Sequence, residues 1–138
     1  AVRVGGGANH RLGLYDAMLI KDNHIKVAGG ITAALDRAHA YAGHMTKIEI
    51  EVENMDGVKE ALAAGADVIM LDNMSADRMA ECVKVIDHKA VVEASGGITE
   101  ETIVAAAKSG VDVISVGALT HSVKALDISM DIGEIKTA

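Results

Sequence analysis

Short apolar segments that alternate with helical patterns are the feature that most constrains the fold of this chain. Residues 68–71 are wholly apolar, and similar segments lie at 17–20, 90–92 and 111–116. Strands that alternate with helices form parallel sheets with right-handed crossovers. A wholly apolar strand also needs cover on both faces, as parallel strands receive from their helices. The repeat therefore predicts an α/β fold with a parallel sheet.

The remaining elements follow from periodicity and capping residues. Residues 47–53 alternate between polar and apolar side chains, which indicates a strand with one apolar face. Helices are predicted at 31–41, 56–64, 75–86 and 99–110, with Ser75 and Thr99 as N-caps and Gly43, Gly65 and Gly110 at the ends. Beyond them, one last helix and a closing strand are expected around Val123, Leu126, Ile128 and Met130.

No linker or change of composition divides the chain, so residues 1–138 are predicted to form one domain. Five strands are too few to close a ring of eight. The expected architecture is therefore a partial (β/α) barrel with parallel strands, part of a TIM-like barrel, with one edge left open.

Composition excludes several classes of protein. Half of the residues are hydrophobic, which fits a globular core, and the net charge of −7 argues against a general nucleic-acid surface. No apolar run reaches the roughly 18 residues that a membrane helix needs, so no membrane partner is expected. The single cysteine, Cys82, cannot form an internal disulfide. It favours a reducing compartment, and we expect a cytoplasmic location.

A polar side chain or a glycine follows each predicted strand, where β/α barrels carry their active sites. These exit residues are Lys21, Glu51, Asp72, Glu93 with Ser95, and Gly117. The first strand is also preceded by His10 and Arg11, so that cations flank it on both sides. Cations gathered in this way predict a site for an anionic ligand, although a solvated loop is the simpler alternative for any one residue.

Three carboxylates share one face of the alternating strand: Glu49, Glu51 and Glu53. Inside a barrel they would repel one another, so either this face meets solvent or some of them pair with Lys21, Arg11 or a metal. Glu51 and Asp72 follow successive strands and together could hold Mg²⁺ or accept hydrogen bonds from sugar hydroxyls. The simpler alternative is that one of them pairs with Lys21.

Two glycine turns follow the last two strands, at 95–97 and 117–118. Exposed backbone N–H groups beside a helix N-terminus favour a phosphate, and barrels often build phosphate sites in their last two loops. An ordinary glycine turn is the alternative.

Several of these segments resemble the quinolinate phosphoribosyltransferases, also called nicotinate-nucleotide pyrophosphorylases (carboxylating). The resemblance rests on GGGANHRLGLYDAMLIKDNHI, EIEVEN, IMLDNMS, EASGGIT and ISVGALTHS, which occur in the family's order over nearly the whole chain. It implies a pentosyltransferase of de novo NAD biosynthesis. The reaction would convert quinolinate and phosphoribosyl pyrophosphate into nicotinate mononucleotide, CO₂ and pyrophosphate, with Mg²⁺ as cofactor and a homodimer as the assembly.

The resemblance also implies a role for each site residue. His10, Arg11 and Lys21 would bind the quinolinate carboxylates, and Glu51 and Asp72 would serve the ribose and the metal, with Lys21, Glu51 and Asp72 as the catalytic set. The phosphate loops would be Ser95, Gly96 and Gly97 with Val116, Gly117 and Ala118.

The family also has an N-terminal domain and first barrel strands that these residues lack. We therefore expect the C-terminal portion of a catalytic barrel domain, inactive in isolation. Two other functions remain open: a related barrel phosphoribosyltransferase that acts on nicotinate or another aromatic acid, and a non-catalytic module that binds a phosphate ligand.

Overall fold

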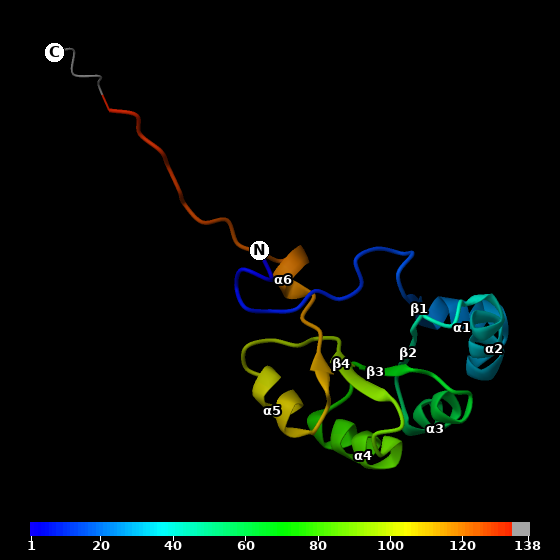
Figure 1. Ribbon diagram of the computed structural model, residues 1–138. Helices are drawn as coiled ribbons and strands as arrows, with labels where there is room; N and C mark the ends of the chain where they lie inside the picture. Colours follow the sequence, from blue (N-terminus) through cyan, green and yellow to red (C-terminus); the bar gives the residue numbers. More distant parts are fainter. Residues whose placement is uncertain (134–138) are drawn as a thin grey trace.

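A curved sheet of five parallel strands forms the centre of the computed structural model, which describes residues 1–133 (Figure 1). The strands lie side by side in chain order, which confirms the predicted parallel sheet and the open edge. They are β1 (Met18–Ile20), β2 (Ile48–Val52), β3 (Val68–Asp72), β4 (Val91–Ser95) and β5 (Val113–Ile114).

Helices join the strands and cover the outer face of the sheet (Figure 1). They are α1 (Asp22–Ala28), α2 (Ile31–Tyr41), α3 (Met55–Ala63), α4 (Ala76–Ile86) and α5 (Ile103–Lys108). The short α6 (Ala118–His121) follows the last strand and lies near the N-terminus (Figure 1). Within residues 1–133, none of the helices has the length and apolar character needed to cross a membrane.

Local signals predicted several helix ends correctly. The Ser75 Oγ accepts a hydrogen bond from the Arg78 N–H, which confirms the predicted N-cap of α4. Gly65 and Gly110 follow α3 and α5 with φ of +80° and +90°, a region that glycine enters without the steric cost of a Cβ.

Two local expectations were wrong, and one helix was not predicted. The helix that was not predicted is α1, which follows Lys21 and whose first turn is held by a hydrogen bond from the Lys21 N–H to His24 Nδ1 at 2.9 Å. Thr99 does not cap α5: its N–H donates to Thr102 Oγ1, so the chain makes a separate turn before the helix begins at Ile103. After α2 the chain leaves in an extended conformation at Ala42, not in a left-handed conformation at Gly43.

The expected closing strand is absent from the tail as far as residue 133. The last described helix is α6, which lies before the tail, and no strand of the sheet pairs with the residues that follow it. The tail side chains Val123, Leu126, Ile128 and Met130 are all at least 70% exposed. A strand needs a partner edge and a surface to cover, and the described part of the chain provides neither here. Residues 134–138 lie outside the described residues.

Alternation along the strands separates the core from the inner face. Ile48, Ile50, Ile69 and Leu71 are no more than 1% exposed and belong to the aliphatic core beneath the helices, which also contains Leu35. The residues between them on β2 and β3 point to the opposite, inner face. This face therefore carries the polar side chains of the strands.

Truncation of the central core residue should cost much of the stability. We expect Leu71→Ala to lower the free energy of unfolding by about 2–5 kcal/mol, because Leu71 is fully buried and its loss leaves a cavity. Urea unfolding followed by circular dichroism measures this. Leu126→Ala is the matched control, since Leu126 is 80% exposed and its truncation should change little. Equal losses in the two variants would contradict this description of the core.

Candidate active site

Most candidate site residues lie on the inner face, near the carboxyl edge of the sheet. The period of two along β2, β3 and β4 turns Glu51, Asp72 and Ser95 to this side, and parallel register brings their strand ends to one edge. Because Asp72 pairs with Ser95 in the register, these two residues are direct neighbours. The prediction that strand exits converge is confirmed for these three positions.

Lys21 and Glu51 form an ion pair at the ends of β1 and β2. The Lys21 Nζ lies 3.3 Å from Glu51 Oε2, and the lysine side chain is 54% exposed while the glutamate is 15% exposed. This is the pairing that the sequence left open for Lys21. The same Glu51 oxygen is buried and accepts no hydrogen bond from the described residues. It can therefore accept a further donor or cation.

The three carboxylates of the alternating segment differ in their exposure and in their partners. Glu53 is exposed to solvent, whereas Glu51 pairs with Lys21 and Glu49 lies near His10. Glu53 follows the last residue of β2, so ion pairing occurs within the strand and solvent exposure just beyond its end; both outcomes were anticipated from the sequence.

Asp72 contacts the glycine turn that follows β4. The Asn73 side chain donates to Asp72 Oδ2 at 2.7 Å, and the Asn73 N–H donates to the Ser95 carbonyl at 3.0 Å. A Cβ at Gly96 would overlap the Asn73 side chain and lie 2.7 Å from Asp72 Oδ1. The turn therefore requires glycine at this position, and a carboxylate lies directly beside it.

Both glycine turns present backbone amides that are free to bind an anion. Gly96 and Gly97 have φ of +81° and +61°, and among residues 1–133 no acceptor is found for their N–H groups. Gly117, at φ of −60°, precedes the first turn of α6, where the N–H groups of Gly117 and Ala118 also lack acceptors in the described chain. Successive free N–H groups of this kind form anion-binding concavities.

One cavity connects the two turns with the N-terminal segment. It has a volume of about 530 Å³ and is lined by His10, Glu93, Ser95, Val116 and Gly117 among others. A larger hollow, of about 760 Å³, lies at the opposite ends of the strands. The structure thus brings His10 together with the candidate phosphate loops.

Arg11 lies apart from Lys21. Its Nη1 donates to the Ala17 carbonyl at 3.2 Å, and its side chain lines a cavity of about 230 Å³ at the amino ends of the strands. Because a strand rises about 3.3 Å per residue, the entry and exit of β1 are separated by roughly 10 Å. In this structure Arg11 and Lys21 therefore have different partners, and their grouping around one ligand stays a prediction.

The loop that carries Arg11 has its own internal support. Asp16 accepts hydrogen bonds from the N–H groups of Leu12 and Gly13 at 2.8 and 2.9 Å, and these bonds lower the pKa of its carboxyl group. They close the loop just before β1 begins.

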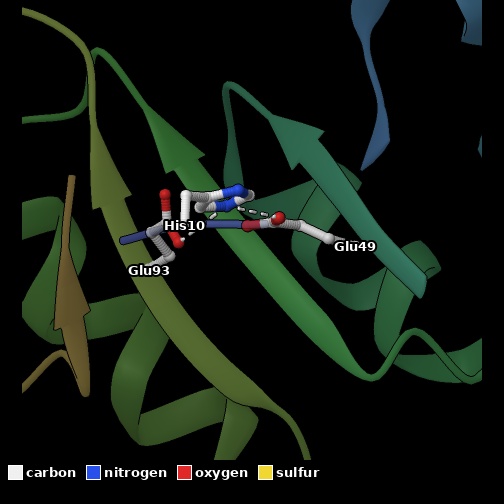
Figure 2. A group of neighbouring side chains, drawn as sticks. All are labelled: His10, Glu49 and Glu93. Carbon is white, nitrogen blue, oxygen red and sulfur yellow. Dashed lines mark ion pairs between the residues drawn. The ribbon is translucent and has the colours of Figure 1, made fainter. Parts of the chain in front are cut away.

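Sequence reasoning missed the environment of His10. Its Nε2 lies 3.0 Å from Glu49 Oε2 and 3.6 Å from Glu93 Oε2, so three separate segments of the chain meet at one point on the inner face (Figure 2). Burial, followed by the negative charge of Glu93, raises the pKa of Glu49 to about 7, although His10 opposes this rise. One sequence signal could have indicated this cluster. Glu93 is an acidic residue within the otherwise largely apolar strand 91–95, which is a place where a carboxylate needs a partner.

A family model agrees with this geometry. The model described as quinolinate phosphoribosyl transferase, C-terminal domain, matches residues 1–131. The chain belongs to this family. The resemblance noted from the motifs is thereby confirmed, and so is the α/β fold with an open parallel sheet.

Relatives and solved structures point the same way. The chain is 54% identical over 132 residues to a probable nicotinate-nucleotide pyrophosphorylase [carboxylating] of Bacillus subtilis, covering 96% of this chain and 46% of that protein. It is 48% identical to the protein of the same name from Methanocaldococcus jannaschii, covering 96% and 49%. The solved nicotinate-nucleotide pyrophosphorylase of Francisella tularensis is 49% identical, with a TM-score of 0.86 over 93% of this chain and 45% of that one. The chain thus spans about half the length of these relatives.

The stability of this chain should depend on the absence of a side chain at Gly96, beside Asn73 and Asp72. We expect Gly96→Ala to destabilise the chain and disturb the turn, because a Cβ there overlaps Asn73. Gly29→Ala is the matched control: φ is +95° at Gly29, but nothing lies within 4 Å of the added Cβ. Thermal unfolding of both variants separates the contact from the backbone strain. An equal loss of stability would show that only strain matters.

The raised pKa of Glu49 should appear in the pH dependence of stability. The folded protein binds this proton more tightly than the unfolded chain, whose carboxyl group has an ordinary value of 4.5. Stability contributed by the proton is therefore lost as pH rises from about 4.5 towards about 7. Urea unfolding at pH 5 and pH 8 should show Glu49→Gln gaining stability relative to wild type at the higher pH. Glu81→Gln, at an exposed position on α4, is the control and should follow the wild-type profile.

Proposed function

We propose that this chain forms part of the active site of an enzyme that transfers phosphoribose from phosphoribosyl pyrophosphate to quinolinate, with loss of CO₂. The observation that carries the proposal is the contact between Asp72 and the glycine turn at Gly96. A phosphoribosyl ligand carries sugar hydroxyls and a phosphate on one small ring. A carboxylate beside free backbone amides offers an acceptor for the first and donors for the second.

Phosphate binding is assigned to the two glycine turns. In this proposal the N–H groups of Gly96 and Gly97 hold one phosphate, with Ser95 adding a hydroxyl. Val116, Gly117 and Ala118 supply a second set of donors across the cavity of about 530 Å³. Such backbone donors favour negative charge without requiring a basic side chain.

Quinolinate is a dianion and needs cations to collect it in a chain of net charge −7. Lys21 is assigned to one carboxylate at the carboxyl edge, where more than half of its side chain is exposed. His10 and Arg11 are assigned to the same substrate, as the family resemblance implies. For Arg11 this requires the guanidinium to exchange the Ala17 carbonyl for the ligand, since it donates there in this structure.

Glu51 and Asp72 are assigned to the ribose. Cleavage of the bond to pyrophosphate develops positive charge on the sugar, which carboxylates nearby stabilise. Removal of CO₂ then leaves an electron pair on the ring carbon, which the positive charge of the adjacent alkylated nitrogen stabilises. A proton from water takes the place of the lost carboxylate on that carbon. Lys21, Glu51 and Asp72 are thus the proposed catalytic residues.

Mg²⁺ fits this edge of the sheet. It binds through one or two carboxylates together with substrate phosphates, and the buried Glu51 Oε2 without a hydrogen bond is a suitable oxygen ligand. Glu51 and Asp72 would hold the ion, which when bound offsets the charge of the leaving pyrophosphate. A homodimer and a cytoplasmic location remain predictions.

A chimeric enzyme tests the proposed reaction. This chain would replace the matching half of the Bacillus subtilis relative, and CO₂ release from quinolinate would be measured with phosphoribosyl pyrophosphate and Mg²⁺. We expect turnover in the chimera and none from the chain alone. Lys21→Ala and Asp72→Asn should each lower kcat/KM by about 100-fold or more, as loss of a group that stabilises a transition state does.

The same assay distinguishes the other candidate functions. Turnover of nicotinate in place of quinolinate, without CO₂, would indicate the sister phosphoribosyltransferase. Binding of phosphoribosyl pyrophosphate without any turnover in a folded chimera would indicate the non-catalytic module. Lys84→Ala, on the exposed surface of α4, is the control for Lys21→Ala and should leave the rate unchanged.

A further inference from the structure

His10, Glu49 and Glu93 converge on the inner face from three separate segments: the chain before β1, strand β2 and strand β4 (Figure 2). One ligand atom from each lies within 4.8 Å of the other two. Metal–ligand bonds to nitrogen and oxygen are about 2 Å long, so two atoms on one cation lie at most about 4 Å apart, and the widest separation here needs to close by less than about 1 Å.

The two carboxylates are buried without enough compensating charge. Glu49 is 6% exposed and Glu93 is 3% exposed, and among the described residues their only ionic partner is His10. The Oε1 atoms of both lack any hydrogen bond in the described chain. Buried carboxylates are costly unless they are paired or bind a metal. When both carboxylates are ionised, one imidazolium leaves one negative charge unbalanced.

Arg11, the neighbouring basic residue, does not balance this negative charge. Arg11 follows His10 in the chain, but its guanidinium donates to the Ala17 carbonyl and forms no ion pair with either carboxylate. The negative charge therefore remains directed at the space beside His10 Nε2.

We propose that His10, Glu49 and Glu93 bind one first-row divalent cation of the Zn²⁺ or Mn²⁺ type. One imidazole nitrogen with two carboxylates suits these ions, whereas Mg²⁺ prefers an all-oxygen shell that retains water. The site is separate from the proposed Mg²⁺ ligands Glu51 and Asp72, but it shares His10 with the quinolinate contacts of the proposed function. The cation would fix the N-terminal segment across β2 and β4, beside the cavity that His10 and Glu93 line.

Metal titration of the full chain tests the site. After treatment with a chelator and its removal, the chain is titrated at pH 7.5 with Zn²⁺ alone, Mn²⁺ alone and Mg²⁺ alone in a calorimeter. We expect one Zn²⁺ or Mn²⁺ per chain, with clearly weaker binding of Mg²⁺. His10→Gln, Glu49→Gln and Glu93→Gln should each weaken binding at least about tenfold, since even outer-shell changes cost 10–100-fold. Zn²⁺ should also raise the Tm of the wild type but not that of the variants.

Matched substitutions separate this site from its neighbours and from surface histidines. His44→Gln and Glu81→Gln change exposed residues of the same types, and both should bind like the wild type. Glu51→Gln should also retain Zn²⁺. His10→Gln keeps the test valid if a core carboxylate variant fails to fold, because the His10 side chain is 39% exposed. No binding by the wild type, unchanged binding by His10→Gln, or loss with Glu51→Gln would each overturn the proposal.

Discussion

The parallel register of the five strands is the constraint on which the rest of the structure depends. Because all strands run in one direction, every exit lies at the same edge, and because side chains alternate, every second residue faces the same side. Glu51, Asp72 and Ser95 become neighbours through these two facts alone. A shift of one residue in β3 would turn Asp72 into the core and its apolar neighbours onto the inner face.

The same geometry creates an electrostatic problem. The inner face gathers acidic side chains from β2, β3 and β4, and the sheet itself provides no positive charge to balance them. The balance comes from segments outside the sheet: Lys21 reaches Glu51 from the end of β1, and His10 reaches Glu49 and Glu93 from the N-terminal segment. The residues before β1 are therefore part of the site and not a peripheral extension.

The two groups of acids differ in what surrounds them. Glu51 lies at the edge beside a half-exposed lysine, where water and ligands can reach the pair. Glu49 lies deeper, and burial together with Glu93 raises its pKa to about 7. One strand thus carries two carboxylates with different tendencies to ionise, because depth within the sheet changes their solvation.

The sequence by itself determined the class of fold, the order of most elements and the positions of most strand exits, since these depend on local periodicity and on turn residues. Glu93 is the exception, because it lies in the middle of β4. Its motifs also indicated the family. Only the tertiary structure decided which side chains meet. Arg11 donates to the Ala17 carbonyl while Lys21 pairs with Glu51, and the meeting of His10 with Glu49 and Glu93 joins segments that are distant in sequence. The helix α1 and the absence of a strand in the described part of the tail also became clear only from the tertiary structure. Capping contacts and partner edges are properties of the folded chain.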